Sequence, residues 1–219
     1  MENKSEKHQK DKATTEREYH SPINGVLKVR WEKGKKILDT EHTNYSYGSL
    51  EDVLNYGLDN IPLENVNSVL LLGMGGGCMI SSLKNRYNCQ APITAIELDP
   101  MLIDIAEKEF GVVQSKNLSI LETDAYQYIT ETKDSFDLII IDIFIDLLVP
   151  EKFYKPEFWN AMTKVVNLNG FVLFNTGIDL TEEQVNDFLD TLPDCFLYQV
   201  MFEVFESNTL IILNKFSEE

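Results

Sequence analysis

The chain has 219 residues with ordinary proportions of hydrophobic (43%) and charged (25%) side chains, which fit one globular domain and exclude a disordered, collagen-like or coiled-coil protein. Its 36 acidic residues outnumber 19 basic ones and give a net charge of −17; this field repels phosphate backbones and makes nucleic acid a poor partner. No apolar run reaches the ~18 residues of a membrane span, and the polar N-terminus resembles no secretion signal, so we expect a cytoplasmic protein that stays out of membranes.

The N-terminal region changes character at about residue 21. Residues 1–20 are polar and contain no Leu, Ile, Val or Phe, so they predict a flexible arm. Two alternating segments, 26–31 and 36–41, flank a glycine-containing connection and predict a β-hairpin. A helical apolar stripe follows at 50–58. The predicted organisation is an arm at 1–20, a hairpin with a lead-in helix at 21–60, and a main domain at 61–219.

From residue 69 onward, apolar runs of strand length alternate with amphipathic helical patterns, which is typical of a parallel sheet covered on both faces. Two further segments, 196–204 and 209–213, predict a closing antiparallel pair. The sequence therefore predicts an α/β protein with a Rossmann-like, doubly wound, mostly parallel seven-stranded sheet behind an N-terminal β-hairpin. The five parallel strands are predicted at Val69–Leu72, Ile93–Glu97, Leu118–Leu121, Asp137–Asp142 and Phe171–Asn175.

A glycine-rich turn follows the first of these strands directly. Gly73 suits a tight bend, and Gly75 lets a ligand approach the main chain without a β-carbon in the way. Together with Gly77, these residues fit a Gly-x-Gly-x-Gly pattern, whereas a dinucleotide fingerprint would need glycine or alanine where Cys78 stands. We interpret the turn as a cofactor site; a merely tight turn is the alternative.

Carboxylates follow the next three strands. Glu97 stands 24 residues after Gly73, where an acidic side chain can accept hydrogen bonds from both hydroxyls of an adenosine ribose. Asp124, with the main chain of Ala125, could bind an adenine edge, and Asp142 ends the fourth strand. Because the carboxyl ends of parallel strands share one edge of the sheet, we expect these groups to line one ligand site.

These motifs resemble class I S-adenosylmethionine-dependent methyltransferases and, among them, the spermidine synthase-like family. The resemblance implies S-adenosylmethionine as cofactor, held by the glycine turn, with Glu97 on the ribose and Asp124 and Ala125 on the adenine. It also implies that Asp142 is the catalytic proton acceptor, and that a homodimer is one expected assembly. The residues that carry it lie at 69–78, 95–100, 123–125, 136–142 and 169–173, with the hairpin at 23–41.

Two departures from the family pattern bear on the reaction. Gly76 occupies the position at which spermidine synthases have an aspartate that binds the amine of decarboxylated S-adenosylmethionine. Ile145 replaces their second signature aspartate, although Asp146 follows it. The sequence therefore favours methyl transfer to a small acceptor, with a cationic amine among the candidates. The alternatives are a polyamine aminopropyltransferase that uses decarboxylated S-adenosylmethionine, and a cofactor-binding relative without catalysis.

The remaining candidate residues concern the acceptor and metals. Tyr47 lies between the hairpin and the lead-in helix, from where it could contact an acceptor together with Asp146; packing of the hairpin is the alternative role for the tyrosine. The histidines have no metal-ligand spacing, and Cys78, Cys89 and Cys195 form no Cys-x-x-Cys site. Neither a metal site nor a disulfide framework is predicted.

Overall fold

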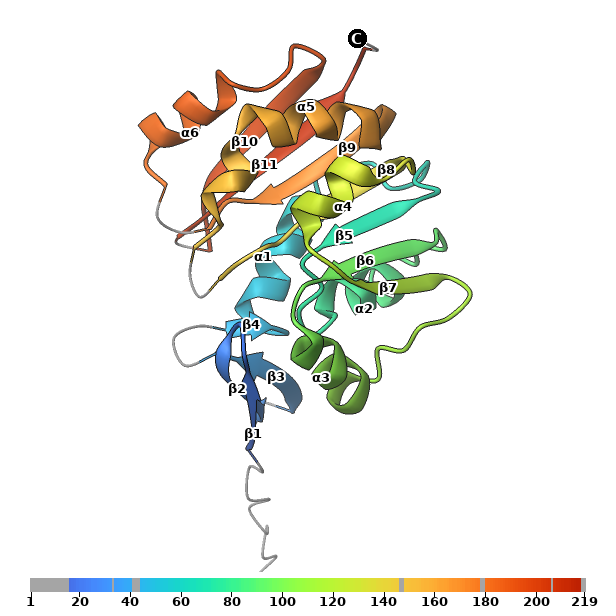
Figure 1. Cartoon of the computed structure of the whole chain (residues 1–219), viewed down its shortest axis with the longest axis vertical. Helices are drawn as coiled ribbons and strands as arrows, with labels where there is room; N and C mark the ends of the chain where they lie inside the picture. The colour runs from blue at the N-terminus through green and yellow to red at the C-terminus, as the bar shows by residue number, and fades with distance from the viewer. Residues whose placement is uncertain are drawn as a thin grey trace, which may run out of the picture.

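The larger of two sheets forms the body of the protein (Figure 1). This computed structural model describes residues 16–32, 34–40, 44–145, 148–177, 180–205 and 207–217. The strand order of the larger sheet is β10-β11-β9-β8-β5-β6-β7. The five strands β9, β8, β5, β6 and β7 are parallel to one another, whereas β11 runs antiparallel to both of its neighbours, β9 and β10. The bounds are β5 Val69–Leu72, β6 Ile93–Glu97, β7 Leu118–Glu122, β8 Phe136–Ile141, β9 Val166–Asn175, β10 Phe196–Val204 and β11 Asn208–Lys215.

Central strand β5 explains why the sheet is covered on both faces. All four of its residues are buried, and successive side chains of a strand point to opposite faces. Val69 and Leu71 join the core beneath α1 and α2, whereas Leu70 and Leu72 join the core beneath α4, α5 and α6. The helices are α1 Ser49–Leu58, α2 Cys78–Asn85, α3 Pro100–Phe110, α4 Ala125–Glu131, α5 Pro156–Val165 and α6 Glu182–Leu189.

The smaller sheet extends the predicted hairpin. The hairpin itself is confirmed as β2 and β3, and it is flanked by β1 and by the short β4. The prediction of a flexible arm up to residue 20 is wrong at its end, because residues 17–21 pair with β2; residues 1–15 lie outside the described part. The bounds are β1 Arg17–Ser21, β2 Gly25–Glu32, β3 Lys35–Asp39 and β4 Asn44–Ser46.

Helix α3 joins the two sheets. Its Leu102 and Ile105 pack with Leu27, Val29 and Leu38 of the smaller sheet in a separate core cluster. At the end of the helix, the buried carboxylate of Glu109 accepts hydrogen bonds from three side chains of the smaller sheet. These donors are the Arg17 guanidinium, the Tyr19 hydroxyl (2.6 Å) and the Lys36 ammonium (3.0 Å).

The predicted strands of the larger sheet agree with the structure except at the start of β9. β5 and β6 have the predicted bounds, and the last two strands form the predicted antiparallel pair, whereas β9 begins at Val166 and not at the predicted Phe171. Helix α4 gives little signal in the sequence, because it has only seven residues, of which Ala125 and Ile129 are buried. Among the described residues, no helix is both long and apolar enough to cross a membrane.

We expect Glu109→Gln to destabilise the fold by roughly 2 kcal/mol, because a neutral amide leaves the partly buried Lys36 without its counter-charge, while the pair with the exposed Arg17 adds little. Burial opposes ionisation of Glu109, but the hydrogen bonds from Tyr19, Lys36 and Arg17 prevail and lower its pKa from 4.5 to about 2. The folded pKa is below the unfolded value, so the stabilisation is present above about pH 4.5 and is lost as the pH falls towards 2. Urea unfolding at pH 7 and at pH 3 measures both effects.

Glu107→Gln is the matched control, since Glu107 lies on the same helix and is exposed. It should leave the free energy of unfolding within about 0.5 kcal/mol of the wild-type value. Equal effects of the two substitutions would contradict the role given to Glu109.

Candidate functional site

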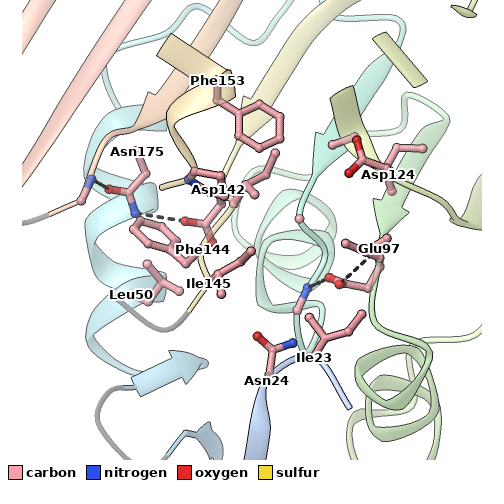
Figure 2. Close-up of a pocket in the computed structure, with 18 of the residues that line it drawn as sticks. Ile23, Asn24, Leu50, Glu97, Asp124, Asp142, Phe144, Ile145, Phe153 and Asn175 are labelled. Atoms are coloured by element: carbon pink, nitrogen blue, oxygen red, sulfur yellow. Dashed lines mark hydrogen bonds between the residues drawn. The ribbon is translucent and has the colours of Figure 1, made fainter. Parts of the chain in front are cut away.

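A cavity of about 320 Å³ opens at the carboxyl ends of the parallel strands (Figure 2). It lies where β5 is flanked by β6 on one side and β8 on the other, the switch point at which open α/β sheets bind ligands. The predicted residues Gly73, Gly75, Glu97, Asp124, Ala125 and Asp142 all line it. The expectation that these strand ends meet around one space therefore agrees with the structure.

The glycine turn is shaped by close contacts with the neighbouring main chain. Gly73 has a φ of +83°, and a Cβ on it would lie 2.1 Å from the carbonyl oxygen of Asp142. Gly77 is the N-cap of α2, where a Cβ would lie 2.7 Å from Val112. Gly77 is not among the cavity-lining residues, so it serves the packing of the turn, whereas Gly73 and Gly75 face the cavity.

Glu97 is a buried carboxylate held by main-chain N–H groups. Oε2 accepts a hydrogen bond from Gly75 N (2.9 Å), and Oε1 accepts from Leu98 N (2.9 Å) and Asp99 N (3.0 Å). Burial raises the pKa of Glu97, and the three N–H donors oppose that shift. A carboxylate has about four acceptor positions, so these bonds leave capacity on Oε2 for another donor.

Asp124 has two structural partners. Its Oδ1 caps helix α4 by accepting from Tyr126 N (2.8 Å) and Gln127 N (3.1 Å), and its Oδ2 lies 2.6 Å from Nζ of Lys152. Burial would raise the pKa of Asp124, but Lys152 and the helix N–H groups lower it. Asp124 is therefore ionised at neutral pH and fixes the position of Lys152 at the cavity wall.

Asp142 differs from the other two carboxylates because no cation pairs with it among the described residues. Its Oδ1 accepts a hydrogen bond from Nδ2 of Asn175 (3.0 Å) at the end of β9. Burial raises the pKa of Asp142 to about 7; Asn175 lowers it, and the charge of Glu97 raises it further. A carboxyl group with a pKa near neutrality can take up and release a proton at physiological pH.

One predicted substrate residue, Tyr47, does not line this cavity. Tyr47 stacks on Phe110, with ring centroids 4.4 Å apart, and its hydroxyl lies 3.1 Å from Oγ of Ser81. Tyr47 is absent from the lining, so the structure gives it the packing role that was the alternative. Asp146 lies outside the described residues.

Sequence reasoning missed several residues of the site. Asn175 could have been found, because it ends the fifth predicted strand and the strand-end rule applies there as well. Lys152 gave no signal, since its role depends on the fold of the chain after β8. On the far side of the cavity, Ile23 and Asn24 come from the β1–β2 turn (Figure 2), which Asn24 and Ser21 attach to Asp99 at the start of α3.

Among the described residues, no three His, Cys, Asp or Glu side chains lie close enough together to hold a metal ion. The three cysteines are free thiols.

Comparison with known proteins identifies the family. Residues 19–212 match the model of the spermine/spermidine synthase domain. The chain belongs to this family. The match confirms the predicted resemblance. The curated relatives and the structurally similar proteins found by the comparisons are transferases.

The curated relatives differ in the group they transfer. A probable polyamine aminopropyl transferase of Bifidobacterium longum is 27% identical over 135 residues, which are 61% of this chain and 30% of that protein. An eEF1A lysine and N-terminal methyltransferase homolog of Drosophila melanogaster is 23% identical over 196 residues, 83% of this chain and 29% of that protein. The chain therefore spans about a third of the length of these relatives.

Solved structures confirm the predicted fold class. A probable spermidine synthase from Corynebacterium glutamicum has a TM-score of 0.74 at 16% identity and covers 92% of this chain and 80% of its own. Human methyltransferase-like protein 13 in complex with SAH has a TM-score of 0.64 at 22% identity, and the match covers 79% of this chain and 84% of that protein's chain. The fold is that of class I methyltransferases, with the N-terminal hairpin that the sequence predicts.

We expect Gly73→Ala to destabilise the fold by roughly 4 kcal/mol or more, because its Cβ would overlap the Asp142 carbonyl and move the strand end. Gly25→Ala is the matched control: Gly25 also has a left-handed φ of +68°, but nothing lies within 4 Å of its Cβ position. It should cost only about 1 kcal/mol, from backbone strain alone. Thermal unfolding of both variants measures the difference, and similar losses would contradict the steric constraint at Gly73.

Proposed function

We propose that this protein is an S-adenosylmethionine-dependent methyltransferase that acts on an amine. The observation that carries the proposal is the cavity itself, which lies at the switch point of the sheet. It is lined by the glycine turn, by the buried Glu97 and by Asp142, whose pKa is raised to about 7. The residues fit the cofactor: Glu97 can accept from a ribose hydroxyl, and Ile96, Ile143 and Phe153 provide apolar walls for a flat base. Asp124 and Ala125 stay the predicted adenine contacts.

The surroundings of Gly76 support methyl transfer over aminopropyl transfer. A Cβ at Gly76 would lie 3.0 Å from Cβ and 3.1 Å from Oγ of Ser46, and 3.4 Å from Leu38. An aspartate there, which the family resemblance associates with the amine of the decarboxylated cofactor, would crowd the side chains of Ser46 and Leu38 and require them to shift. Aminopropyl transfer stays the second candidate, because the family model and several relatives carry polyamine names.

When bound, S-adenosylmethionine would supply a methyl carbon that its sulfonium already activates. A cationic amine has to lose one proton before its nitrogen has the lone pair to attack that carbon. The protein has to hold the amine in line and accept that proton. Asp142 is suited to both tasks, since its carboxylate lines the cavity and its pKa lies near 7. A net charge of −17 would also attract a small cationic acceptor. A cytoplasmic location and a homodimer remain predictions from the sequence.

Replacement of Asp142 by asparagine should lower kcat by about 10²–10⁴-fold, because the amide cannot accept the proton. S-adenosylmethionine affinity should stay within a factor of about 3, since the substitution is isosteric and leaves Glu97 in place. In the wild type, the rate should fall as the pH drops below about 7, where Asp142 becomes protonated. An unchanged turnover in the variant would remove the catalytic role of Asp142.

Calorimetric titration with both cofactors tests the choice of reaction. We expect S-adenosylmethionine to bind at least as tightly as its decarboxylated form, and Glu97→Gln to weaken binding by about 10-fold through the loss of a charged acceptor. Much tighter binding of the decarboxylated form would favour the aminopropyltransferase. If neither compound raises the melting temperature at millimolar concentration, a non-catalytic relative becomes the better description.

A further inference from the structure

Asn175 is the residue that contacts the proposed proton acceptor from the interior of the protein. It is fully buried at the end of β9, and its main chain is paired with Leu210 of β11. Its Nδ2 donates a hydrogen bond to Oδ1 of Asp142 (3.0 Å), as Figure 2 shows. The position of Asn175 is thus set by the sheet, not by a mobile loop.

The orientation of the Asn175 amide is also fixed. Its Oδ1 accepts a hydrogen bond from the main-chain N–H of Gly177 (3.2 Å). A flipped amide would point Nδ2 at the Gly177 N–H and Oδ1 at Asp142, so two donors would face each other and two acceptors would face each other. Both hydrogen bonds would be lost inside the protein, which is costly for buried polar groups. Asn175 can therefore only donate towards Asp142.

We propose that Asn175 is a positioning residue that confines the exchangeable proton of Asp142 to Oδ2. An amide N–H can donate but not accept, and it donates a stronger hydrogen bond to the unprotonated oxygen of a carboxyl group than to its hydroxyl oxygen, so the Asn175 donor favours the proton on Oδ2. Oδ1 stays unprotonated in both states of the carboxyl group, and uptake and release of the proton take place on Oδ2. The role of that proton in methyl transfer rests on the proposed function, whereas its location on Asp142 does not.

The main chain of Asp142 is held just as firmly. Its N–H donates to the Leu72 carbonyl (2.9 Å), and its own carbonyl oxygen fills the space that a side chain on Gly73 would need. With the main chain fixed by β5 and the turn, and Oδ1 fixed by β9, the carboxyl group has little freedom to exchange its two oxygens. The acceptor amine would therefore meet one defined oxygen.

Among the described residues, two titratable groups from neighbouring elements are coupled to the Asp142 carboxyl group. Glu97 on β6 raises its pKa by like-charge repulsion, and Cys78 on α2 has a thiol whose own pKa burial raises to about 11, so it is neutral near pH 7. Burial is the largest cause of the raised pKa of Asp142, and the Asn175 hydrogen bond opposes it. Without the Asn175 N–H, burial and the charge of Glu97 remain, and both raise the pKa of Asp142.

The decisive experiment is a pH titration of the Asp142 carboxyl carbon by NMR, with ¹³C-labelled aspartate and with Asp142→Asn to assign the signal. We expect Asn175→Leu, which keeps the branched shape but has no donor, to move the midpoint upward by about 1 pH unit. Asn214→Leu is the matched control: Asn214 also donates its amide within the sheet, to the Gly170 carbonyl (3.1 Å). It should leave the titration unchanged.

Asn175→Asp keeps the test decisive if the leucine variant does not fold. The new carboxylate is isosteric and can still accept from Gly177, but it presents no donor to Asp142 unless it is itself protonated. We expect coupled titration of the two groups, with the upper step above the wild-type midpoint. A midpoint that stays at the wild-type value in both variants would overturn the proposal, even if the melting temperature falls, because a purely structural role would change stability alone.

Activity gives a second readout. In both Asn175 variants, the acid limb of the kcat profile should shift upward with the NMR midpoint, while the affinity for S-adenosylmethionine stays within a factor of about 3. A kcat profile that does not follow the NMR midpoint would overturn the link between this proton and catalysis. If the wild type transfers no methyl group to any amine, the proposed function fails, and the NMR titration still decides the role of Asn175.

Discussion

The contact between Gly73 and the carbonyl of Asp142 is the constraint on which the site depends. There is no space for a Cβ at Gly73, because that atom would lie 2.1 Å from the carbonyl oxygen. This close approach brings the ends of β5 and β8 together, so the glycine turn and the carboxyl group of Asp142 border the same cavity. A larger residue at Gly73 would push the turn away from the end of β8 and so separate the turn from Asp142.

The three carboxylates around the cavity show how one sheet edge gives similar side chains different properties. Glu97 accepts hydrogen bonds from three main-chain N–H groups, and Asp124 pairs with Lys152. Within the described part of the chain, the hydrogen-bond partner of the Asp142 carboxyl group is the neutral amide of Asn175. Burial raises the pKa of Glu97 and raises that of Asp142 to about 7, whereas Lys152 and the N–H groups of α4 lower the pKa of Asp124. When environments separate the protonation of neighbouring groups in this way, they also separate binding roles from proton-transfer roles.

The sequence was sufficient for the parts of the fold that local patterns determine. Buried parallel strands such as β5 and β6 are short apolar runs, and the strand-end rule then placed Glu97 and Asp142 at one edge. It was insufficient where a role depends on distant partners. Asp124 was interpreted as a ligand contact, although it also caps α4 and pairs with Lys152. Arg17 and Tyr19 of β1 are held by hydrogen bonds to Glu109, which lies about 90 residues away along the chain. No local sequence pattern indicates that contact.

The smaller sheet contributes to the site in two ways that its position in the sequence does not suggest. Its β1–β2 turn is attached to Asp99, whose N–H in turn binds the Glu97 carboxylate. Its β4 places Ser46 against Gly76, where a side chain on the turn would need space. The main chain that holds Glu97 and the space beside Gly76 thus both depend on how this sheet docks. Because the docking rests on α3 and on Glu109, a change in the outer sheet would move Asp99 and Ser46 without a change in Asp142.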